Sequence, residues 1–187
     1  MKRLTFYKPN SKNSGAAFQI SIGKTNELFF KLIKQSGWDD VKKRGSFKDN
    51  VNSPQKSMAS KLNALEAASI INSINSKVEF KTYHKSKNQN LMISFGLMLD
   101  KTTNQEKGFS LRILKEEATN SVDKIQFSMG FYPNEALLLK MFLEEYIKLS
   151  FEQEVQTQEE VAATLPQQSP AQTSPPSTDH GSSDDEW

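Results

Sequence analysis

Apolar and polar side chains alternate with a period of two through much of residues 18–131. This pattern is typical of strands that bury one face and expose the other. The pattern predicts one group of four strands near the N-terminus, the last of them short and around residues 44–48, and a second group of four between residues 78 and 131. The apolar sets are Phe18, Ile20 and Ile22; Leu28, Phe30 and Leu32; Val78 and Phe80; Ile93, Phe95, Leu97 and Leu99; Phe109, Leu111 and Ile113; and Ile125, Phe127, Met129 and Phe131.

Two segments break the alternation and predict helices. Ser57 is expected to cap the first, whose apolar residues run from Leu62 to Ile74. The second is expected to begin at Asn134, with Glu135 in its first turn, where the helix dipole favours a carboxylate. The order of elements predicts an α+β fold in which two four-stranded antiparallel sheets are combined with two helices.

The second helix is unusually apolar. Its charged residues between positions 136 and 149 are Lys140, Glu144, Glu145 and Lys148, which form one narrow stripe. A helix that is apolar over most of its circumference is buried on more than one side, so we expect the second side to contact another subunit of a homodimer or homotetramer. The alternative is a helix covered by its own sheet. The expected interface residues are Leu138, Met141, Phe142 and Tyr146.

The C-terminal segment differs in composition from the rest of the chain. From about residue 155 it is rich in Gln, Thr, Ser, Pro, Ala and acids, and no periodic apolar pattern remains. Such a segment buries too little apolar surface to offset the entropy lost on ordering. We therefore predict a folded domain over residues 1–154 and a disordered tail over residues 155–187.

Charge is segregated along the chain. All 24 Lys and Arg residues lie before residue 149, whereas eight of the 22 Asp and Glu residues follow residue 150. The first 150 residues therefore carry a formal charge of +10 and the remainder −8. This asymmetry predicts an anionic partner for the domain and a tail that competes with that partner or recruits others. The alternative is that both charges serve only solubility.

The composition also argues against several classes of site. The chain has no Cys, and its only histidines are His84 and His180, so we expect no disulfide, metal or cofactor and no Ser-His-Asp or Cys-His catalytic arrangement. No apolar run reaches the length of a signal peptide or a membrane span, which predicts a soluble, cytoplasmic protein.

Binding of single-stranded nucleic acid requires cations for the phosphates and exposed rings for the bases. Strand alternation and basic clusters supply candidates of both kinds, although aromatic residues such as Phe29 are also common in cores. Trp38 and Tyr83 are amphipathic and flanked by lysines, which suits an exposed surface. The candidates are Phe29, Lys31, Trp38, Lys42, Lys43, Arg44, Lys81, Tyr83, Lys85, Arg112 and Lys115.

The order of four strands, a helix, four strands and a helix resembles the Whirly proteins of plants and the trypanosome mitochondrial guide-RNA-binding proteins; coactivators of the positive-cofactor-four type have one such half per subunit. The resemblance implies binding of single-stranded nucleic acid, and helices that pack between subunits while the sheets face outward. Short sequence matches to the Whirly pattern occur at Trp38-Asp39, Lys43-Arg44, Phe47, Ser53-Pro54 and Val78-Glu79-Phe80.

The last residues resemble the acidic tips of bacterial and phage single-stranded DNA-binding proteins, in which a flexible linker presents acids and a final aromatic residue. The resemblance implies that the tip recruits replication and recombination proteins. Its carboxylates would meet a basic pocket and its indole an apolar slot. The residues concerned are Asp184, Asp185, Glu186 and Trp187.

Three functions therefore remain. The first is a non-enzymatic single-stranded DNA-binding protein that acts in replication, recombination or repair, and the second is an RNA-binding or transcription-linked protein of the same fold. The third is a metal-dependent nuclease, because Glu79-Phe80-Lys81 matches half of such a site and Asp39, Asp40 or Asp49 would complete it. A phosphate-binding loop at Gly23-Lys24-Thr25 is excluded, because Phe18 stands where the motif requires a glycine.

Overall fold

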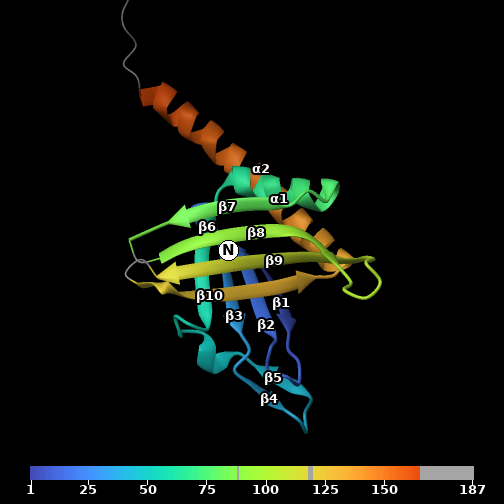
Figure 1. Ribbon diagram of the computed structural model, residues 1–187. Coiled ribbons are helices and arrows are strands. Elements are labelled where there is room, and N and C mark those ends of the chain that lie inside the picture. Colours follow the sequence, from blue (N-terminus) through green and yellow to red (C-terminus); the bar gives the residue numbers. More distant parts are fainter. Residues whose placement is uncertain (88, 118–119, 165–187) are drawn as a thin grey trace, which may run out of the picture.

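A computed structural model describes residues 1–87, 89–117 and 120–164. It contains two four-stranded antiparallel sheets and two helices, which confirms the predicted α+β fold (Figure 1). The first sheet has the strand order β1-β2-β3-β6 and the second has the order β10-β9-β8-β7. The elements are β1 (Lys2–Lys8), β2 (Ala16–Ile22), β3 (Leu28–Lys34), β4 (Gly37–Asp39), β5 (Arg44–Ser46), η1 (Lys48–Asn50), β6 (Ser57–Leu62), α1 (Ala64–Ser76), β7 (Phe80–Lys85), β8 (Gln89–Leu99), β9 (Glu106–Glu117), β10 (Asn120–Phe131) and α2 (Pro133–Thr164).

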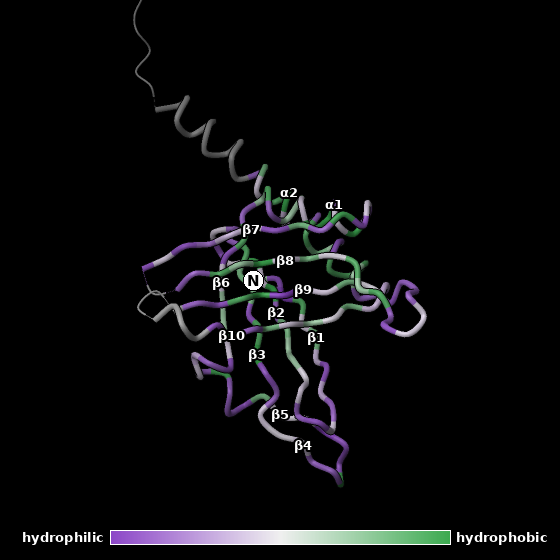
Figure 2. Tube along the Cα trace, in the orientation of Figure 1, coloured by the Kyte–Doolittle hydropathy of each residue, from purple (hydrophilic) through white to green (hydrophobic). Residues whose placement is uncertain are grey.

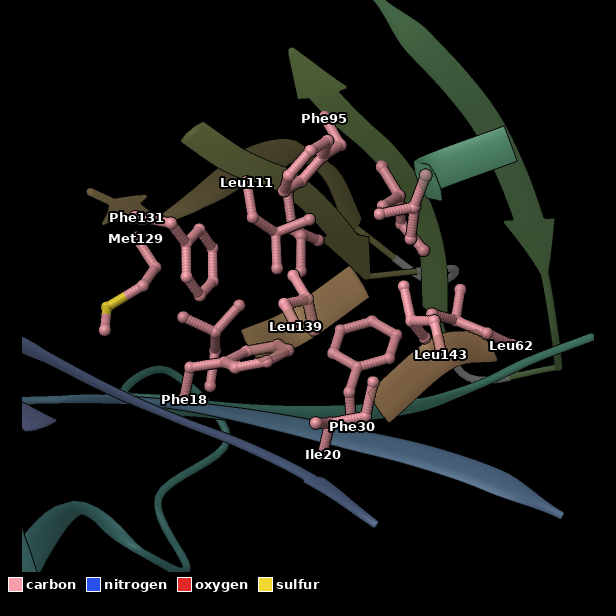
Figure 3. Close-up of a cluster of buried hydrophobic side chains, with 14 of the residues drawn as sticks. Phe18, Ile20, Phe30, Leu62, Phe95, Leu111, Met129, Phe131, Leu139 and Leu143 are labelled. Atoms are coloured by element: carbon pink, nitrogen blue, oxygen red, sulfur yellow. The ribbon is translucent and has the colours of Figure 1, made fainter. Parts of the chain in front are cut away.

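The two sheets lie face to face with their strands crossing steeply, and the core lies between them (Figures 1 and 3). The residues that the strands bury between the sheets are mostly apolar, as the alternation predicts. Figure 2 shows how hydrophobic and hydrophilic residues are distributed along the strands. The ring of Phe131 in β10 makes edge contacts with Phe6 and Phe18 of the first sheet, each with 5.4 Å between ring centroids. Leu139 and Leu143 of α2 enter the same cluster. Full burial of each such side chain stabilises the fold by about 1.5–3 kcal/mol.

The first helix begins later than predicted. Residues Ser57–Leu62 form β6, the edge strand of the first sheet, and the Ser57 hydroxyl donates hydrogen bonds to loop carbonyls instead of capping a helix. The true N-cap is Asn63, whose side chain accepts a hydrogen bond from the Glu66 N–H at 2.8 Å. In return, the Glu66 carboxylate accepts a hydrogen bond from the Asn63 N–H at 3.0 Å. This reciprocal capping box fixes the start of α1.

The strand predicted around residues 44–48 is also placed differently. It appears as β5, which pairs only with β4 in a small separate hairpin, and the fourth strand of the first sheet is β6. The buried side chain of Gln35 anchors this hairpin, because its amide donates hydrogen bonds to the carbonyls of Gly37 and Asn10, each at 2.9 Å. Residues 44–48 lack a set of inward apolar residues that would hold a strand against the core.

Helix α2 begins at Pro133, and not at Asn134 as predicted. Pro is favoured in the first helical turn because its missing N–H has no intrahelical partner there. Just before the helix, the Tyr132 N–H donates a hydrogen bond to the Glu135 carboxylate at 2.7 Å. The helix continues to Thr164, past the domain boundary expected at residue 154, and that boundary stays a prediction. In the part of the chain that the structure describes, no helix is long and apolar enough to cross a membrane.

Candidate nucleic-acid interface

Neither of the two described helices covers the outer face of the second sheet. Both helices contribute their buried residues to the core between the sheets, and so lie on the other side of this sheet. Figure 1 looks onto the outer face, with α2 and the first sheet behind it. The side chains that point outward from β7 to β10 therefore meet solvent and are available to a ligand.

Strand register arranges these outward side chains in rows across the sheet. Tyr83 pairs with Met92, which pairs with Leu114, and these three residues form what we call the apolar row. Tyr83 is 55% exposed and Met92 is 51% exposed, so both present their side chains to solvent. A ring and a thioether beside each other form a flat apolar surface of the kind on which a nucleobase can stack.

A row of cations lies next to the apolar row. In register, Lys81 aligns with Ser94, Arg112 and Ser128, and we call Lys81 and Arg112 the cationic row. Lys81 forms a salt bridge of 2.8 Å with exposed Glu79. Among the side chains that the structure describes, Arg112 forms no salt bridge, so its guanidinium is available to a phosphate. Lys85, two residues beyond Tyr83 on β7, is exposed on the same face.

Lys115 does not join this surface, contrary to the prediction. It is 7% exposed and points to the inner side of β9, where its ammonium donates a hydrogen bond to the Pro54 carbonyl at 2.8 Å. The reason is strand parity: Lys115 and Arg112 are three residues apart on one strand, so their side chains leave opposite faces. Lys115 therefore ties the second sheet to the loop before β6.

Phe29 and Lys31 lie on the outer face of the other sheet. Phe29 aligns with Arg3 through Ser21 on one side and with Lys61 on the other. The Lys61 ammonium lies 5.0 Å from the centroid of the Phe29 ring, and this ring is half-buried. The first sheet thus has a cationic outer face of its own, separate from that of the second sheet.

The basic cluster around Trp38 occupies a third place, on the β4–β5 hairpin. Trp38 is half-exposed and donates a hydrogen bond from Nε1 to the Asp40 carboxylate at 3.1 Å. Lys42, Lys43 and Arg44 are exposed in the turn and in β5. The structure therefore distributes the predicted residues over two sheet faces and a hairpin, and Figure 1 shows the hairpin beyond the end of the first sheet.

The expected interface on α2 divides into exposed and buried positions. Leu138 is 50% exposed and Met141 is 57% exposed, and neighbouring Leu137 is exposed as well. Phe142 is half-buried. Tyr146 is buried in its own chain, and both burial and the nearby Glu66 carboxylate raise the pKa of its phenol. Leu138 and Met141 thus remain available for contact with a second copy, whereas Tyr146 is buried within its own chain.

A polar network that sequence reasoning missed links the edges of the two sheets. His84 on β7 lies between Glu66 of α1, 2.6 Å from its carboxylate, and Ser60 of β6, 3.0 Å from its hydroxyl. Thr82 donates a second hydrogen bond to Glu66 at 2.8 Å. Burial raises the pKa of Glu66, but hydrogen bonds from His84, the Asn63 N–H and Thr82 outweigh it, so the pKa lies below its ordinary value. The three-residue spacing of Asn63 and Glu66 is typical of a capping box, so this part of the network could be predicted from the sequence.

The structure does not group Glu79 with the aspartates that would complete a nuclease site. Glu79 is engaged by Lys81, and Asp39, Asp40 and Asp49 lie on or near the hairpin and η1. Among the side chains that the structure describes, no group of three or more His, Asp or Glu residues is arranged to hold a metal ion.

No protein-family profile matches the sequence, and no curated protein matches it. Solved structures with a similar fold include two from plants and one from a trypanosome. The Arabidopsis thaliana protein WHY1 is 10% identical, with a TM-score of 0.58 over 90% of this chain and 95% of that one. The plant transcriptional regulator PBF-2 is 10% identical, with a TM-score of 0.56 over 83% and 86% of the two chains.

The third is the MRP1/MRP2 structure from Trypanosoma brucei, which is 14% identical, with a TM-score of 0.55 over 80% of this chain and 85% of that one. At these identities the likeness concerns the fold, and it extends over most of each chain. The chain therefore has the Whirly-like fold that the order of its strands and helices predicts.

Proposed function

We propose that this protein binds single-stranded nucleic acid on the outer face of its second sheet and that it is not an enzyme. The observation that carries the proposal is the apolar row, in which Tyr83 and Met92 are exposed. It lies beside the cationic row on a sheet face that neither described helix covers. The net charge of +10 on the first 150 residues supports an anionic ligand. The Whirly-like fold agrees with this proposal.

The two rows supply the two interactions that an unpaired strand requires. Neighbouring rows are two residues apart along each strand, which separates them by about 6.8 Å. A base that lies on Tyr83 and Met92 therefore has its own backbone close to Lys81 and Arg112. Each stacked base contributes about 1–3 kcal/mol, and the phosphate contacts add a salt-dependent attraction. Every base has a flat face, so the binding is expected to tolerate many sequences.

The proposal is tested by fluorescence anisotropy with a labelled single-stranded oligonucleotide. Tyr83→Ala should weaken binding by about 5- to 150-fold, the equivalent of one stacked base. Lys81→Ala should weaken binding and also make it less sensitive to salt. The matched control is Tyr7→Ala, because Tyr7 is similarly exposed but lies on the first sheet. Wild-type affinity in both Tyr83→Ala and Lys81→Ala would refute the proposal, and a loss in Tyr7→Ala alone would move the site to the first sheet.

We propose that the ligand is single-stranded DNA in replication, recombination or repair, and that the acidic tip at Asp184, Asp185, Glu186 and Trp187 recruits other proteins. The support is compositional, since these acids and Trp187 follow a basic domain. These tip residues lie outside the described residues. A pull-down with full-length protein tests the tip: loss of Trp187 should reduce capture of partner proteins and leave DNA affinity nearly intact, and unchanged capture would remove the recruiting role.

An RNA-binding or transcription-linked role is the second candidate, favoured by the likeness of the fold to a plant transcriptional regulator. Competition between DNA and RNA oligonucleotides of one sequence separates the two ligands. The nuclease alternative is tested by incubation with magnesium. Cleavage that disappears in Glu79→Ala would overturn the non-enzymatic proposal.

A further inference from the structure

A hollow of about 480 Å³ opens on the outer face of the second sheet, at the end where β8 and β9 are joined. This volume falls in the range of about 300–1,000 Å³ that is typical of small-molecule sites. The side chains that decide its chemistry are those of Met98, Lys101, Ser110, Arg112 and Ser128, and Gly130 leaves it open. Arg112 also belongs to the cationic row, so the hollow adjoins the proposed binding surface.

Strand register explains why the sheet is hollowed here. Ser110 of β9 pairs with Gly130 of β10, so two small residues lie side by side on the sheet, and both line the hollow. Gly96, on the other side of Ser110, lies under the Glu79 side chain and does not line the hollow. A Cβ on Gly130 would meet the end of the Met98 side chain at 3.4 Å, in ordinary contact. Gly130 is thus compatible with a side chain, and such a side chain would occupy the hollow.

The charge of the hollow is positive. Its acidic residue, Asp100, accepts hydrogen bonds from the N–H groups of Thr102 and Thr103 at 2.9 and 3.1 Å, which hold its pKa at about 2. Lys107 lies 3.4 Å from the same carboxylate and offsets its charge. Lys101 and Arg112 are exposed, and neither forms a salt bridge with another described residue. Two cations are therefore available to an anion.

We propose that the hollow binds one nucleotide of a single strand, turned out of the stack on the apolar row. Arg112 and Lys101 hold its phosphate, the Met98 thioether contacts the face of the base, and the hydroxyls of Ser110 and Ser128 reach polar atoms on the base edge. A cluster of cations alone fits any anion. The thioether and the two hydroxyls beside them fit a nucleotide, which presents a charge, a flat face and a polar edge.

This inference rests on the proposed function and adds a separate site to it. The first test is titration of the full-length, nitrogen-15-labelled protein with thymidine 5′-monophosphate, followed by NMR. The amide signals of Ser110, Ser128 and Gly130 should shift, with much smaller shifts for thymidine or inorganic phosphate at the same concentration. Equal shifts with inorganic phosphate would reduce the hollow to an anion site and overturn the proposal, as would no shift with the nucleotide.

The second test fills the hollow. Gly130→Val and Ser128→Val each add a branched side chain that suits a strand, and each should weaken binding of a labelled single-stranded oligonucleotide by about fivefold or more. Gly37→Val is the matched control, because a Cβ at Gly37 meets no atom within 4 Å and the residue lies outside the second sheet. Circular dichroism verifies that each variant folds.

The two proposals fail differently in these experiments. If both valine variants fold and bind the oligonucleotide as tightly as wild type, the nucleotide site is refuted, while a loss in Tyr83→Ala and Lys81→Ala still supports the apolar and cationic rows. If wild-type protein fails to bind the oligonucleotide at all, the proposed function is refuted with it.

Discussion

Lys115 illustrates how strongly one residue's position on a strand decides its role. Its charge suggested a ligand contact, but its parity on β9 directs it inward to the Pro54 carbonyl. Such a lysine contributes to the fold, because a buried ammonium needs a hydrogen-bond partner. Arg112, three residues before Lys115 on the same strand, faces the solvent.

We predict that Lys115→Glu destabilises the protein by about 2–4 kcal/mol, because it places a carboxylate against a carbonyl oxygen in a buried position. Lys115→Met keeps a long, unbranched side chain and should destabilise the protein less than Lys115→Glu. Urea unfolding measures both effects. Lys115→Met should bind single-stranded DNA like wild type, and a loss of affinity comparable with that of Lys81→Ala would contradict the inward placement.

Gly108 is a second residue whose role follows from its position, because its backbone conformation favours glycine. Its φ is 137°, and a Cβ there would lie 2.0 Å from the Phe131 carbonyl oxygen, closer than any real contact. We expect Gly108→Ala to destabilise the fold by more than about 1 kcal/mol. Thermal unfolding, with Gly37→Ala as the unstrained control, is the measurement. Equal midpoints for the two variants would show that β9 can relax around the added methyl group.

Helix α1 is stabilised by its N-terminal capping box, whose Glu66 also belongs to the polar network between the sheets. Asn63→Ala removes the acceptor for the Glu66 N–H, so we predict a loss of about 0.5–2 kcal/mol in the free energy of unfolding. Ser57→Ala tests the position first expected to be the cap. A larger loss in Ser57→Ala than in Asn63→Ala would argue against the observed start of α1.

Glu66 predicts a pH dependence. Because its pKa in the folded protein lies below the ordinary value of 4.5, its stabilising contribution is fully present above about pH 4.5 and is lost as the pH falls through the folded-state pKa. Glu66→Gln should lower stability at pH 7 and flatten the fall in stability below pH 4.5. Urea unfolding at several pH values measures the free energy of unfolding of both proteins. If it falls equally steeply with decreasing pH in Glu66→Gln and wild type, Glu66 does not cause the acid sensitivity.

Long alternating segments are the elements that the sequence predicts well. In β8, β9 and β10 several inward apolar residues repeat without interruption, and the structure confirms them as strands. Segment Ser57–Leu62 is short and has only Met58 and Leu62 as buried apolar residues, so its pattern merges with that of the helix that follows. Pairing with β3, a long-range contact, decides its conformation.

The candidate site is less predictable than the fold, because a row crosses strands that are distant in sequence. Alternation assigned Lys81, Tyr83 and Arg112 to the outer face, but only the register shows that Tyr83 adjoins Met92. The burial of Tyr146 and the partners of His84 depend likewise on how α1, α2 and the sheet edges pack. Such contacts have no local signature in the sequence.

For the whole molecule, the exposed leucines and methionine of α2 bear on assembly. We predict that Met141→Glu shifts the protein toward monomer, because it places a charge in an apolar contact between copies. Sedimentation velocity measures the effect, with Lys148→Glu as a control at an exposed, already charged position of the same helix. If wild-type protein is itself monomeric, the proposed assembly through α2 is wrong.

The segregation of charge gives a prediction for binding of single-stranded DNA. Deleting residues 180–187 removes three acids, Asp184, Asp185 and Glu186, that can compete with phosphates for the basic domain. We expect tighter binding of single-stranded DNA, most clearly at low salt, where charges are least screened. Anisotropy titrations of the full and shortened chains at several salt concentrations measure this difference, and equal or weaker binding by the shortened chain would exclude competition by the tip.

The steep crossing of the two sheets sets a limit on the path of any strand that uses both outer faces. Because these faces point in different directions, one strand can contact Tyr83 on the second sheet and Lys31 on the first only by turning around an edge of the molecule (Figure 1). A short oligonucleotide fits on one face and gains nothing from the other. Affinity would then rise in a step once the oligonucleotide is long enough to wrap, and bound long strands would be sharply bent.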